Sequence, residues 1–238
     1  MVGEPDAGEG AMIASGARAD ILKAVRRAIA APPGDRAVDY AGIARDYAAD
    51  GSLDAAQRTA LFADRLTHYN VTVHSADSSS VSRVIGGVCA ARGKRQLVVP
   101  DGFPAALLSA SVEAVPDTGL SYEDLDRREG VLTLATLAVA LTGTIVLTHG
   151  AGEGRRAVTL IPDYHLCVVR ADQIVETVPE AFRRLASLNP ALITTISGPS
   201  ATADIEMIRV RGVHGPRTLD VIIVGAGDHG PGTRQNHS

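Results

Sequence analysis

From residue 71 onward, short apolar runs alternate with segments whose apolar residues recur at helical spacing, and this alternation constrains the fold most. The apolar runs predict strands at 71–74, 96–99, 112–115, 144–149, 157–161, 165–170, 192–196, 208–213 and 219–224. Helices are expected at 77–92, 103–109, 121–126, 131–141, 172–188 and 201–207. Strands that are apolar on both faces and separated by helices are typical of α/β layers around a mostly parallel sheet. The short connection between 144–149 and 157–161 predicts one antiparallel hairpin.

The two ends of the chain lack this alternation. They are rich in glycine and polar residues without periodicity, so we expect disordered tails there. Amphipathic helices are expected at 20–29 and 54–69, ahead of the first strand. The predicted parts are therefore a tail (1–16), a helical extension (17–70), an α/β domain (71–224) and a second tail (225–238).

Composition excludes several classes of protein. The chain has 238 residues, a net charge of −4 and only 3% aromatic residues, whereas nucleic-acid-binding proteins present basic surfaces and aromatic stacking platforms. The acidic first residues do not form a signal peptide. Thr142-Gly143-Thr144 interrupts the apolar stretch from Val131 to Thr148, so no membrane span is expected. We expect a cytosolic protein in which Cys89 and Cys167 stay free thiols.

Motifs for redox cofactors and metals are weak. Two cysteines are too few for an iron–sulfur cluster, which takes about four thiolates. The GxGxxG pattern at 225–230 follows a predicted strand, but Pro231 and Gly232 prevent the helix that a dinucleotide-binding fingerprint needs. Asp163 and His165 share one face of a predicted strand, yet they supply only two ligands. Neither a cofactor nor a metal is therefore expected on this chain.

A glycine-rich segment, 149–156, joins two predicted strands. The free amides around Gly152 and Gly154 are able to form an anion-binding nest, and Arg155 and Arg156 would add bidentate contacts to a carboxylate or phosphate. The alternative is a mobile hairpin turn whose arginines are solvated. Spacing alone does not decide between the two.

A second candidate segment, 197–206, follows a predicted strand and consists of small and acidic residues. Ligands of open α/β sheets bind at the carboxyl ends of strands. Small side chains would let a ligand approach the backbone, and exposed amides at a helix start attract anions. The residues that would form this site are Ser197, Gly198, Ser200, Thr202, Asp204 and Glu206. A well-capped structural turn explains the same residue types.

These segments carry a resemblance to a known family. The runs at 141–148, 154–165, 168–175, 197–206 (Ser-Gly-Pro-Ser-Ala-Thr-Ala-Asp-Ile-Glu) and 213–216 (Val-His-Gly-Pro) resemble the LUD-domain family. The resemblance covers about residues 35–224. It implies a three-layer α/β sandwich like that of the ribose-5-phosphate isomerase and CoA-transferase group. It further implies a role in oxidising L-lactate to pyruvate beside two partners, one with iron–sulfur clusters and one rich in cysteine.

One position departs from the family pattern. Leu141 stands where the family usually has an acidic residue, just before the Thr-Gly step. A role that depends on that carboxylate is therefore not carried over. Since the chain also lacks a motif for a redox cofactor, the resemblance places the electron-transfer chemistry in a partner protein.

The leading hypothesis is an accessory subunit of an L-lactate-oxidising system, with an anion-binding or assembly surface and no redox centre. Its catalytic candidates are Glu206 and His165. Its ligand-binding candidates are Gly143, Thr144, Gly152, Gly154, Arg155, Arg156, Ser197, Gly198, Ser200, Thr202, Asp204 and His214. One alternative is a free-standing isomerase-like or CoA-transferase-like enzyme that acts on a phosphosugar or acyl thioester through Glu206. The other is a structural scaffold without a small-molecule site.

Overall fold

In the computed structural model, the described residues are 7–30, 42–202, 210–211 and 215–225. The chain divides into two units, residues 1–47 and 48–238. The first unit contains helix α1 (Ala7–Ala30), which begins inside the segment expected to be a disordered tail. Its apolar positions Ile21, Leu22 and Val25 recur at helical spacing and are exposed.

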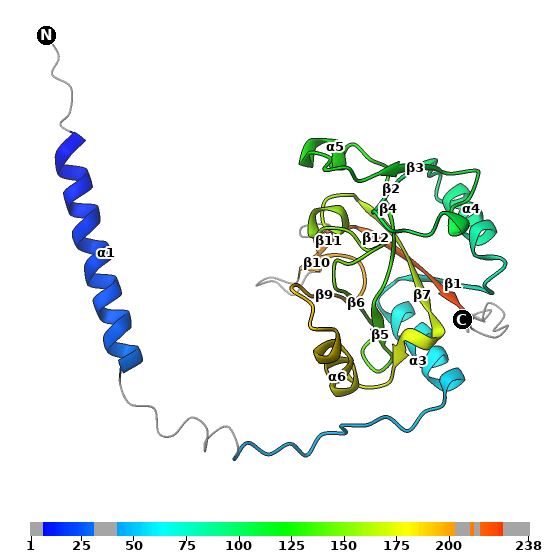
Figure 1. The fold of residues 1–238 in the computed structure, drawn as a ribbon, viewed down its shortest axis with the longest axis horizontal. Helices are drawn as coiled ribbons and strands as arrows, with labels where there is room; N and C mark the ends of the chain where they lie inside the picture. Colours follow the sequence, from blue (N-terminus) through cyan, green and yellow to red (C-terminus); the bar gives the residue numbers. More distant parts are fainter. Residues whose placement is uncertain (1–6, 31–41, 203–209, 212–214, 226–238) are drawn as a thin grey trace, which may run out of the picture. The chain divides into compact units, whose positions relative to one another are not determined.

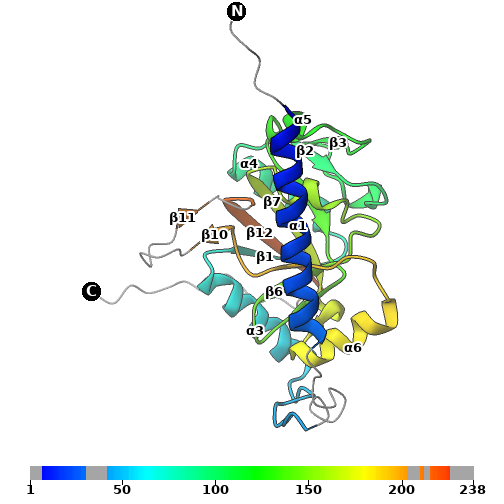
Figure 2. The same cartoon turned by 90° about the vertical axis from the view of Figure 1, so that its left-hand side faces the viewer.

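The second unit is built on a sheet of six strands that are all parallel to their neighbours. In order across the sheet these strands are β1 (Thr72–Ala76), β12 (Thr218–Val224), β7 (Tyr164–Arg170), β4 (Val131–Leu134), β2 (Gln96–Val99) and β3 (Glu113–Pro116). Figure 1 shows the strands within this unit, and Figure 2 shows β1, β12 and β7 side by side. The predicted mostly parallel sheet is confirmed.

A smaller sheet of four strands packs beside the large one. Its strands, in order, are β8 (Ile174–Val175), β5 (Leu137–Val139), β6 (Thr144–Leu147) and β9 (Thr194–Ile196). A two-stranded pair joins β10 (Ala201–Thr202) to β11 (Val210–Arg211). The remaining elements are α3 (Ala55–His68), α4 (Val81–Ala91), α5 (Tyr122–Asp126), α6 (Val178–Leu188) and the 3₁₀ helices η1 (Ala105–Leu107), η2 (Arg156–Thr159) and η3 (Ala171–Gln173).

The central strand β7 shows how the layers form. Successive side chains of a strand point to opposite faces of its sheet. Leu166 and Val168 pack with residues of α4, whereas Cys167 and Val169 pack with residues of α3 and of the small sheet. Helix α4 therefore covers one face of the parallel sheet, while α3 and the small sheet cover the other. This arrangement is an α/β sandwich.

Three predicted elements differ from the structure. The helix expected at 131–141 is wrong, because these residues form β4 and β5 with Thr136 between them. This run has no polar face that would suit a helix surface, and all but three of its residues are buried. The strand expected at 157–161 is also wrong, since η2 begins at Arg156. The predicted hairpin between 144–149 and 157–161 therefore does not exist, and β6 instead pairs antiparallel with β5 and β9.

Two further predictions hold only in part. The helix expected at 172–188 begins at Val178, because the residues before it form η3 and β8. The helix expected at 201–207 starts instead with β10, and its later part lies outside the described residues. Among the described residues, no helix combines the length and the apolar character needed to cross a membrane.

Candidate functional site

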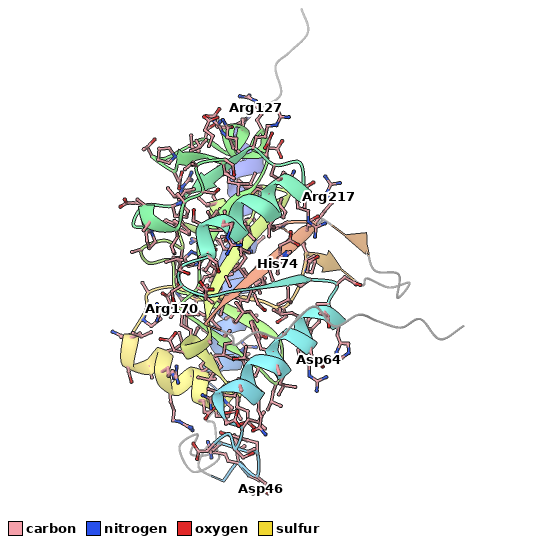
Figure 3. All side chains as sticks on the ribbon, turned by 90° about the vertical axis from the view of Figure 1, so that its right-hand side faces the viewer. Asp46, Asp64, His74, Arg127, Arg170 and Arg217 are labelled. Atoms are coloured by element: carbon pink, nitrogen blue, oxygen red, sulfur yellow. The ribbon has the colours of Figure 1, made fainter. Side chains whose placement is uncertain are left out.

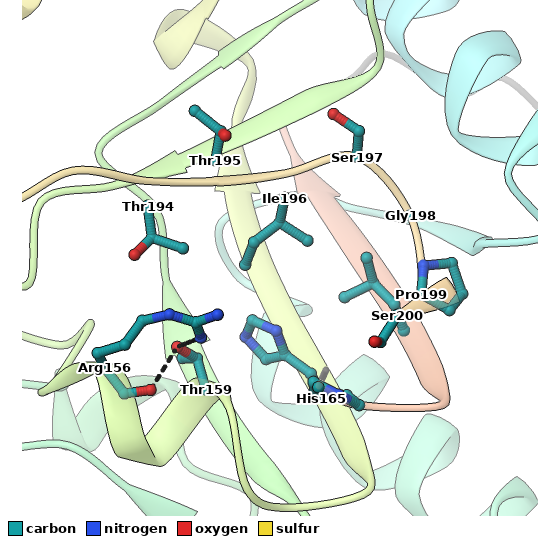
Figure 4. Close-up of a pocket in the computed structure, with 13 residues that line it drawn as sticks. Arg156, Thr159, His165, Thr194, Thr195, Ile196, Ser197, Gly198, Pro199 and Ser200 are labelled. Atoms are coloured by element: carbon teal, nitrogen blue, oxygen red, sulfur yellow. Dashed lines mark hydrogen bonds between the residues drawn. The ribbon is translucent and has the colours of Figure 1, made fainter. Parts of the chain in front are cut away.

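A cavity of about 210 Å³ lies at the amino ends of β7 and β12, where β9 crosses from the small sheet. Figure 4 shows its wall, which combines hydroxyl groups with one arginine and one histidine. The lining residues come from η2, from the start of β7, from β9 with the turn after it, and from the approach to β12. They are Arg156, Thr159, His165, Thr194, Thr195, Ile196, Ser197, Gly198, Pro199, Ser200, Gly215, Pro216 and Leu219.

Local backbone geometry brings the turn after β9 against the cavity. Gly198 has a φ of 88°, and a Cβ atom there would lie 2.5 Å from the Cβ of Tyr69, so only glycine fits. The Ser200 amide donates to the Pro216 carbonyl oxygen at 2.8 Å, which joins the turn to the segment before β12. Thr144 Oγ1 lies 2.8 Å from Ser197 Oγ and ties the turn to β6.

His165 forms the floor of the cavity and is only 1% exposed. Its Nε2 lies 2.8 Å from Thr133 Oγ1. Burial lowers the pKa of His165 to about 4, and the positive charge of Arg156 adds to this effect. The imidazole is therefore neutral at pH 7, so that one ring nitrogen donates a hydrogen bond and the other accepts one.

Arg156 supplies the positive charge of the site. Its Nη1 reaches Thr159 Oγ1 at the long distance of 3.4 Å. Within the part of the chain that the structure describes, Arg156 forms no ion pair with a carboxylate. An exposed guanidinium beside a cavity rich in hydroxyl groups is suited to bind a carboxylate or a phosphate.

Arg155, the residue before it, has a different role. Its Nε and Nη2 donate to the two carboxylate oxygens of Asp117 at 2.9 and 3.0 Å, and Nη2 also donates to the Leu120 carbonyl oxygen. The Arg155 guanidinium lowers the pKa of Asp117. Arg155 is therefore engaged with a carboxylate of the same chain through Nε and Nη2, and its predicted role in holding an external anion stays a prediction.

The glycine-rich loop also differs from the predicted anion nest. The Glu153 carboxylate, 4% exposed, accepts hydrogen bonds from the Thr148 amide at 2.6 Å, from Thr136 Oγ1 at 2.5 Å and from the Gly150 amide at 3.4 Å. The Gly152 amide donates to the Asp101 carbonyl oxygen, and the Gly154 amide donates to that of Gly150. The amides of Gly150, Gly152 and Gly154 are thus occupied by acceptors of this chain.

Gly143 lies apart from the cavity as well. Its φ is 60°, and a Cβ atom there would lie 2.8 Å from the Cβ of Arg65 on α3. The residue therefore allows the β5–β6 turn to approach the helix. Gly152, with a φ of 76°, packs in the same way against Leu134. These glycines have structural roles in close packing.

Among its described residues, this region offers few ligands for a metal. Asp163, expected on one face with His165, instead pairs with Arg217. His149 Nδ1 lies 2.8 Å from the Gly154 carbonyl oxygen, and its Nε2 lies 2.8 Å from Thr194 Oγ1, so this side chain joins the loop to β9. Within the described ranges, no group of three or more His, Cys, Asp or Glu side chains is arranged to hold a metal ion.

The comparisons with known proteins agree on one family. A family model described as the LUD domain matches residues 121–224. Lactate utilization protein C of Deinococcus radiodurans is 43% identical over 183 residues, which covers 75% of this chain and 85% of that protein. This chain belongs to the LUD-domain family. The resemblance expected from the sequence is confirmed.

Two further relatives extend this result. Lactate utilization protein C of Shouchella clausii is 34% identical over 113 residues, which covers 45% of this chain and 49% of that protein. The crystal structure of a DUF162 family protein from Deinococcus radiodurans matches with a TM-score of 0.65 and 38% identity, and it covers 73% of this chain and 100% of that chain. The α/β fold of this LUD-domain protein therefore has a solved counterpart.

Several predicted site residues meet at the cavity of the LUD domain, and others do not. The residues brought together are Arg156, His165, Ser197, Gly198 and Ser200, with Thr144 attached through Ser197. Gly143, Gly152, Gly154 and Arg155 lie outside the cavity lining. Asp204, Glu206 and His214 lie outside the described residues, and so does the side chain of Thr202. The predicted catalytic role of Glu206 stays a prediction.

Sequence reasoning missed the hydroxyl groups on the other walls of the cavity and the one behind His165. Thr159 comes from η2, which was predicted as a strand, so its direction could not be anticipated. Thr194 was placed in a predicted strand but not at a site. Thr133 lies in the segment predicted as a helix, and only the parallel pairing of β4 with β7 brings it to His165. The threonine content of 131–148 and 192–196 was the available signal.

Proposed function

We propose that this protein takes part in L-lactate utilization and that the cavity at Arg156 and His165 binds a small carboxylate. The first part is supported by its relatives, which are named lactate utilization protein C. The observation that carries the second part is the Arg156 guanidinium, which has no carboxylate partner among the described residues and lines a cavity with hydroxyl groups and a neutral histidine. A carboxylate at Arg156 would replace water at a charged group with bidentate hydrogen bonds.

A chain of hydrogen bonds behind His165 favours a ligand with a hydroxyl group. Thr133 Oγ1 donates to Cys167 Sγ at 3.7 Å, and Cys167 Sγ donates to the Leu134 carbonyl oxygen at 3.8 Å. We infer that the single proton of the Thr133 hydroxyl is directed to Cys167 Sγ, so that Thr133 Oγ1 accepts from Nε2–H of His165 at 2.8 Å. This tautomer leaves Nδ1 as an acceptor. An acceptor in the cavity favours the hydroxyl of lactate over the carbonyl of pyruvate, which has no proton to donate.

The electron-transfer step belongs to a partner protein in this proposal. Cys89 and Cys167 lie in separate clusters of the hydrophobic core. Burial raises the pKa of Cys89 to about 11 and that of Cys167 to about 12, so both remain thiols at neutral pH. These residues do not fit an iron–sulfur cluster, which takes about four thiolates. We therefore assign the clusters expected from the family resemblance to a partner, and this chain to an accessory role.

Calorimetric titration with L-lactate and pyruvate tests the binding site. We expect Arg156→Gln to weaken L-lactate binding at least tenfold, and Arg127→Gln, which removes an exposed arginine just after α5, to leave it unchanged. Thr133→Val should reduce the preference for L-lactate over pyruvate. The variant removes the hydroxyl that accepts from Nε2–H, so the proton of His165 is no longer held on Nε2. Equal binding of L-lactate by the wild type and by Arg156→Gln would exclude this cavity as the site. Purification of the tagged protein from lactate-grown cells tests the accessory role, which predicts an iron–sulfur protein among the co-purified chains.

A further inference from the structure

A second cavity, of about 270 Å³, opens at the opposite end of the parallel sheet. Leu134, Val224 and Arg170 mark the carboxyl ends of β4, β12 and β7 at its wall. Figure 3 labels Arg170 at this end of the sheet and Arg217, which precedes β12, at the other. Ligands of open α/β sheets bind outside the carboxyl ends of the strands. The position of the second cavity is therefore the one in which this architecture usually holds a small molecule.

The cavity also adjoins the point at which the strand order reverses. The chain runs from β2 outward to β3 and then returns past β2 to β4. One side of the crevice between β2 and β4 is closed by the glycine-rich loop, because the Gly152 amide donates to the Asp101 carbonyl oxygen and the Leu134 amide donates to that of Gly152. Leu134 also lines the second cavity. The second cavity therefore borders this crevice at Leu134.

The walls of the second cavity are mainly apolar. The apolar lining residues come from α4, from η1 and its flank, and from three strand ends, and they are Val81, Pro104, Leu107, Leu134, Val168 and Val224. Gln173 closes one side, but its amide is already used, since Oε1 accepts from the Arg170 amide and Nε2 donates to the Ala135 carbonyl oxygen. These walls suit an aliphatic group, in contrast to the hydroxyl-rich walls of the Arg156–His165 cavity.

Two polar groups stand at the rim. Ser78 follows β1 and Arg170 ends β7, and these two strands flank β12. Arg170 binds Asp172 through Nε and Nη2 at 3.0 and 3.1 Å, and its Nη1 has no partner among the described residues. Both side chains of this ion pair are well exposed, so the pair is weak and Arg170 is able to exchange its partner.

We propose that this cavity binds an aliphatic carboxylate of short to medium chain length. The alkyl chain lies among Leu107, Leu134 and Val168. The carboxylate lies at the rim, where it accepts hydrogen bonds from Ser78 and from Arg170. This site is separate from the proposed lactate site, and it takes its affinity mainly from apolar burial.

Hexanoate is the probe for this site, and hexanol is the matched neutral probe. We expect hexanoate to bind the full chain in a calorimetric titration, and hexanol to bind at least fivefold more weakly. Leu107→Trp should weaken hexanoate binding tenfold or more, because Leu107 is half-buried at the rim and a larger side chain there fills the cavity. Leu141→Trp, at an exposed position outside the cavity, is the control for added bulk. Absence of hexanoate binding to the wild-type chain would overturn the proposal.

Charge variants separate this site from the cavity at Arg156. Arg170→Gln should weaken hexanoate binding about fivefold without changing hexanol binding. Asp172→Asn should strengthen hexanoate binding, because it frees Arg170 from its own carboxylate partner. Arg156→Gln should leave hexanoate binding unchanged even though it weakens L-lactate binding. If Arg156→Gln abolishes hexanoate binding, hexanoate occupies the lactate site and the second site does not exist. Thermal unfolding checks that each variant is folded. If Leu107→Trp does not fold, Arg170→Gln and Asp172→Asn still decide whether hexanoate binds in the second cavity.

Discussion

The two ends of the parallel sheet differ in whether the chain itself supplies a carboxylate to the polar groups there. At the carboxyl ends of the strands, the chain supplies its own carboxylate, since Glu153 accepts hydrogen bonds from the backbone amides of Thr148 and Gly150. At the amino ends, Arg156 and the neutral His165 face a cavity with no carboxylate among the described lining residues. A glycine-rich loop therefore does not mark an anion site by itself. What matters is whether the chain leaves its donors without an acceptor.

The largest expected effect comes from removing the internal carboxylate. Glu153→Ala leaves two backbone amides and two threonine hydroxyls without this acceptor at a buried position, so we expect about 4 kcal/mol of destabilisation. Chemical denaturation at pH 7 measures this change. Glu123→Ala, on the exposed surface of α5, should change the free energy of unfolding by less than about 0.5 kcal/mol. A stable Glu153→Ala variant would show that the loop is not organised around this carboxylate.

The next effect concerns pH at the opposite end of the sheet. The pKa of His165 is about 4 in the folded protein and 6.5 in the reference state, so the unfolded chain binds a proton first as the pH falls. The contribution of His165 to the free energy of unfolding is therefore fully present above pH 6.5, and it decreases as the pH falls toward 4. The loss is about 3 kcal/mol, since each pKa unit corresponds to about 1.4 kcal/mol.

Unfolding measured between pH 7 and pH 4 checks this slope. His165→Gln should flatten the dependence, because the variant has no imidazole to protonate. His68→Gln is the control, since His68 is an exposed histidine of α3. An equal slope in the wild type and in His165→Gln would assign the pH dependence to other groups.

The smallest difference in stability separates two adjacent arginines. Arg155→Ala leaves Asp117, which is 7% exposed, without its bidentate partner, and we expect a loss of about 2 kcal/mol. Arg156→Ala should change stability by less than about 0.5 kcal/mol, because it breaks no ion pair of the described chain. Thermal unfolding and L-lactate titration on both variants give this comparison directly. Equal stability of the two would contradict the structural role assigned to Arg155.

The sequence predicted much of the fold and part of the site. The 96–99 strand and the helix after Asp54 both follow from local patterns. The helix α3 starts at a capping box formed by Asp54 and Gln57. The region 131–161 could not be predicted in the same way. Its apolar run is buried on all sides, and such a run carries no periodicity that separates a helix from two strands.

Two adjacent arginines show what the sequence could not predict. Arg155 and Arg156 are the same residue type next to the same glycines, and both were predicted to bind an anion. The position of Asp117, 38 residues earlier in the chain, decides that Arg155 pairs with a carboxylate of the same chain. No local pattern contains that information, because the pairing depends on how β3 and η2 are brought together in space.

The sequence by itself determined the layered α/β class, the family and the set of small polar residues around 197–200, because hydrophobic periodicity and local motifs are properties of neighbouring residues. Only the tertiary structure decided which donors remain available for a ligand. Glu153 accepts hydrogen bonds at the glycine-rich loop, and Asp117 pairs with Arg155. Thr133 reaches His165 from a neighbouring strand. The physical reason is that hydrogen bonds and ion pairs depend on distances in space, and the folded chain sets those distances between residues that are far apart in sequence.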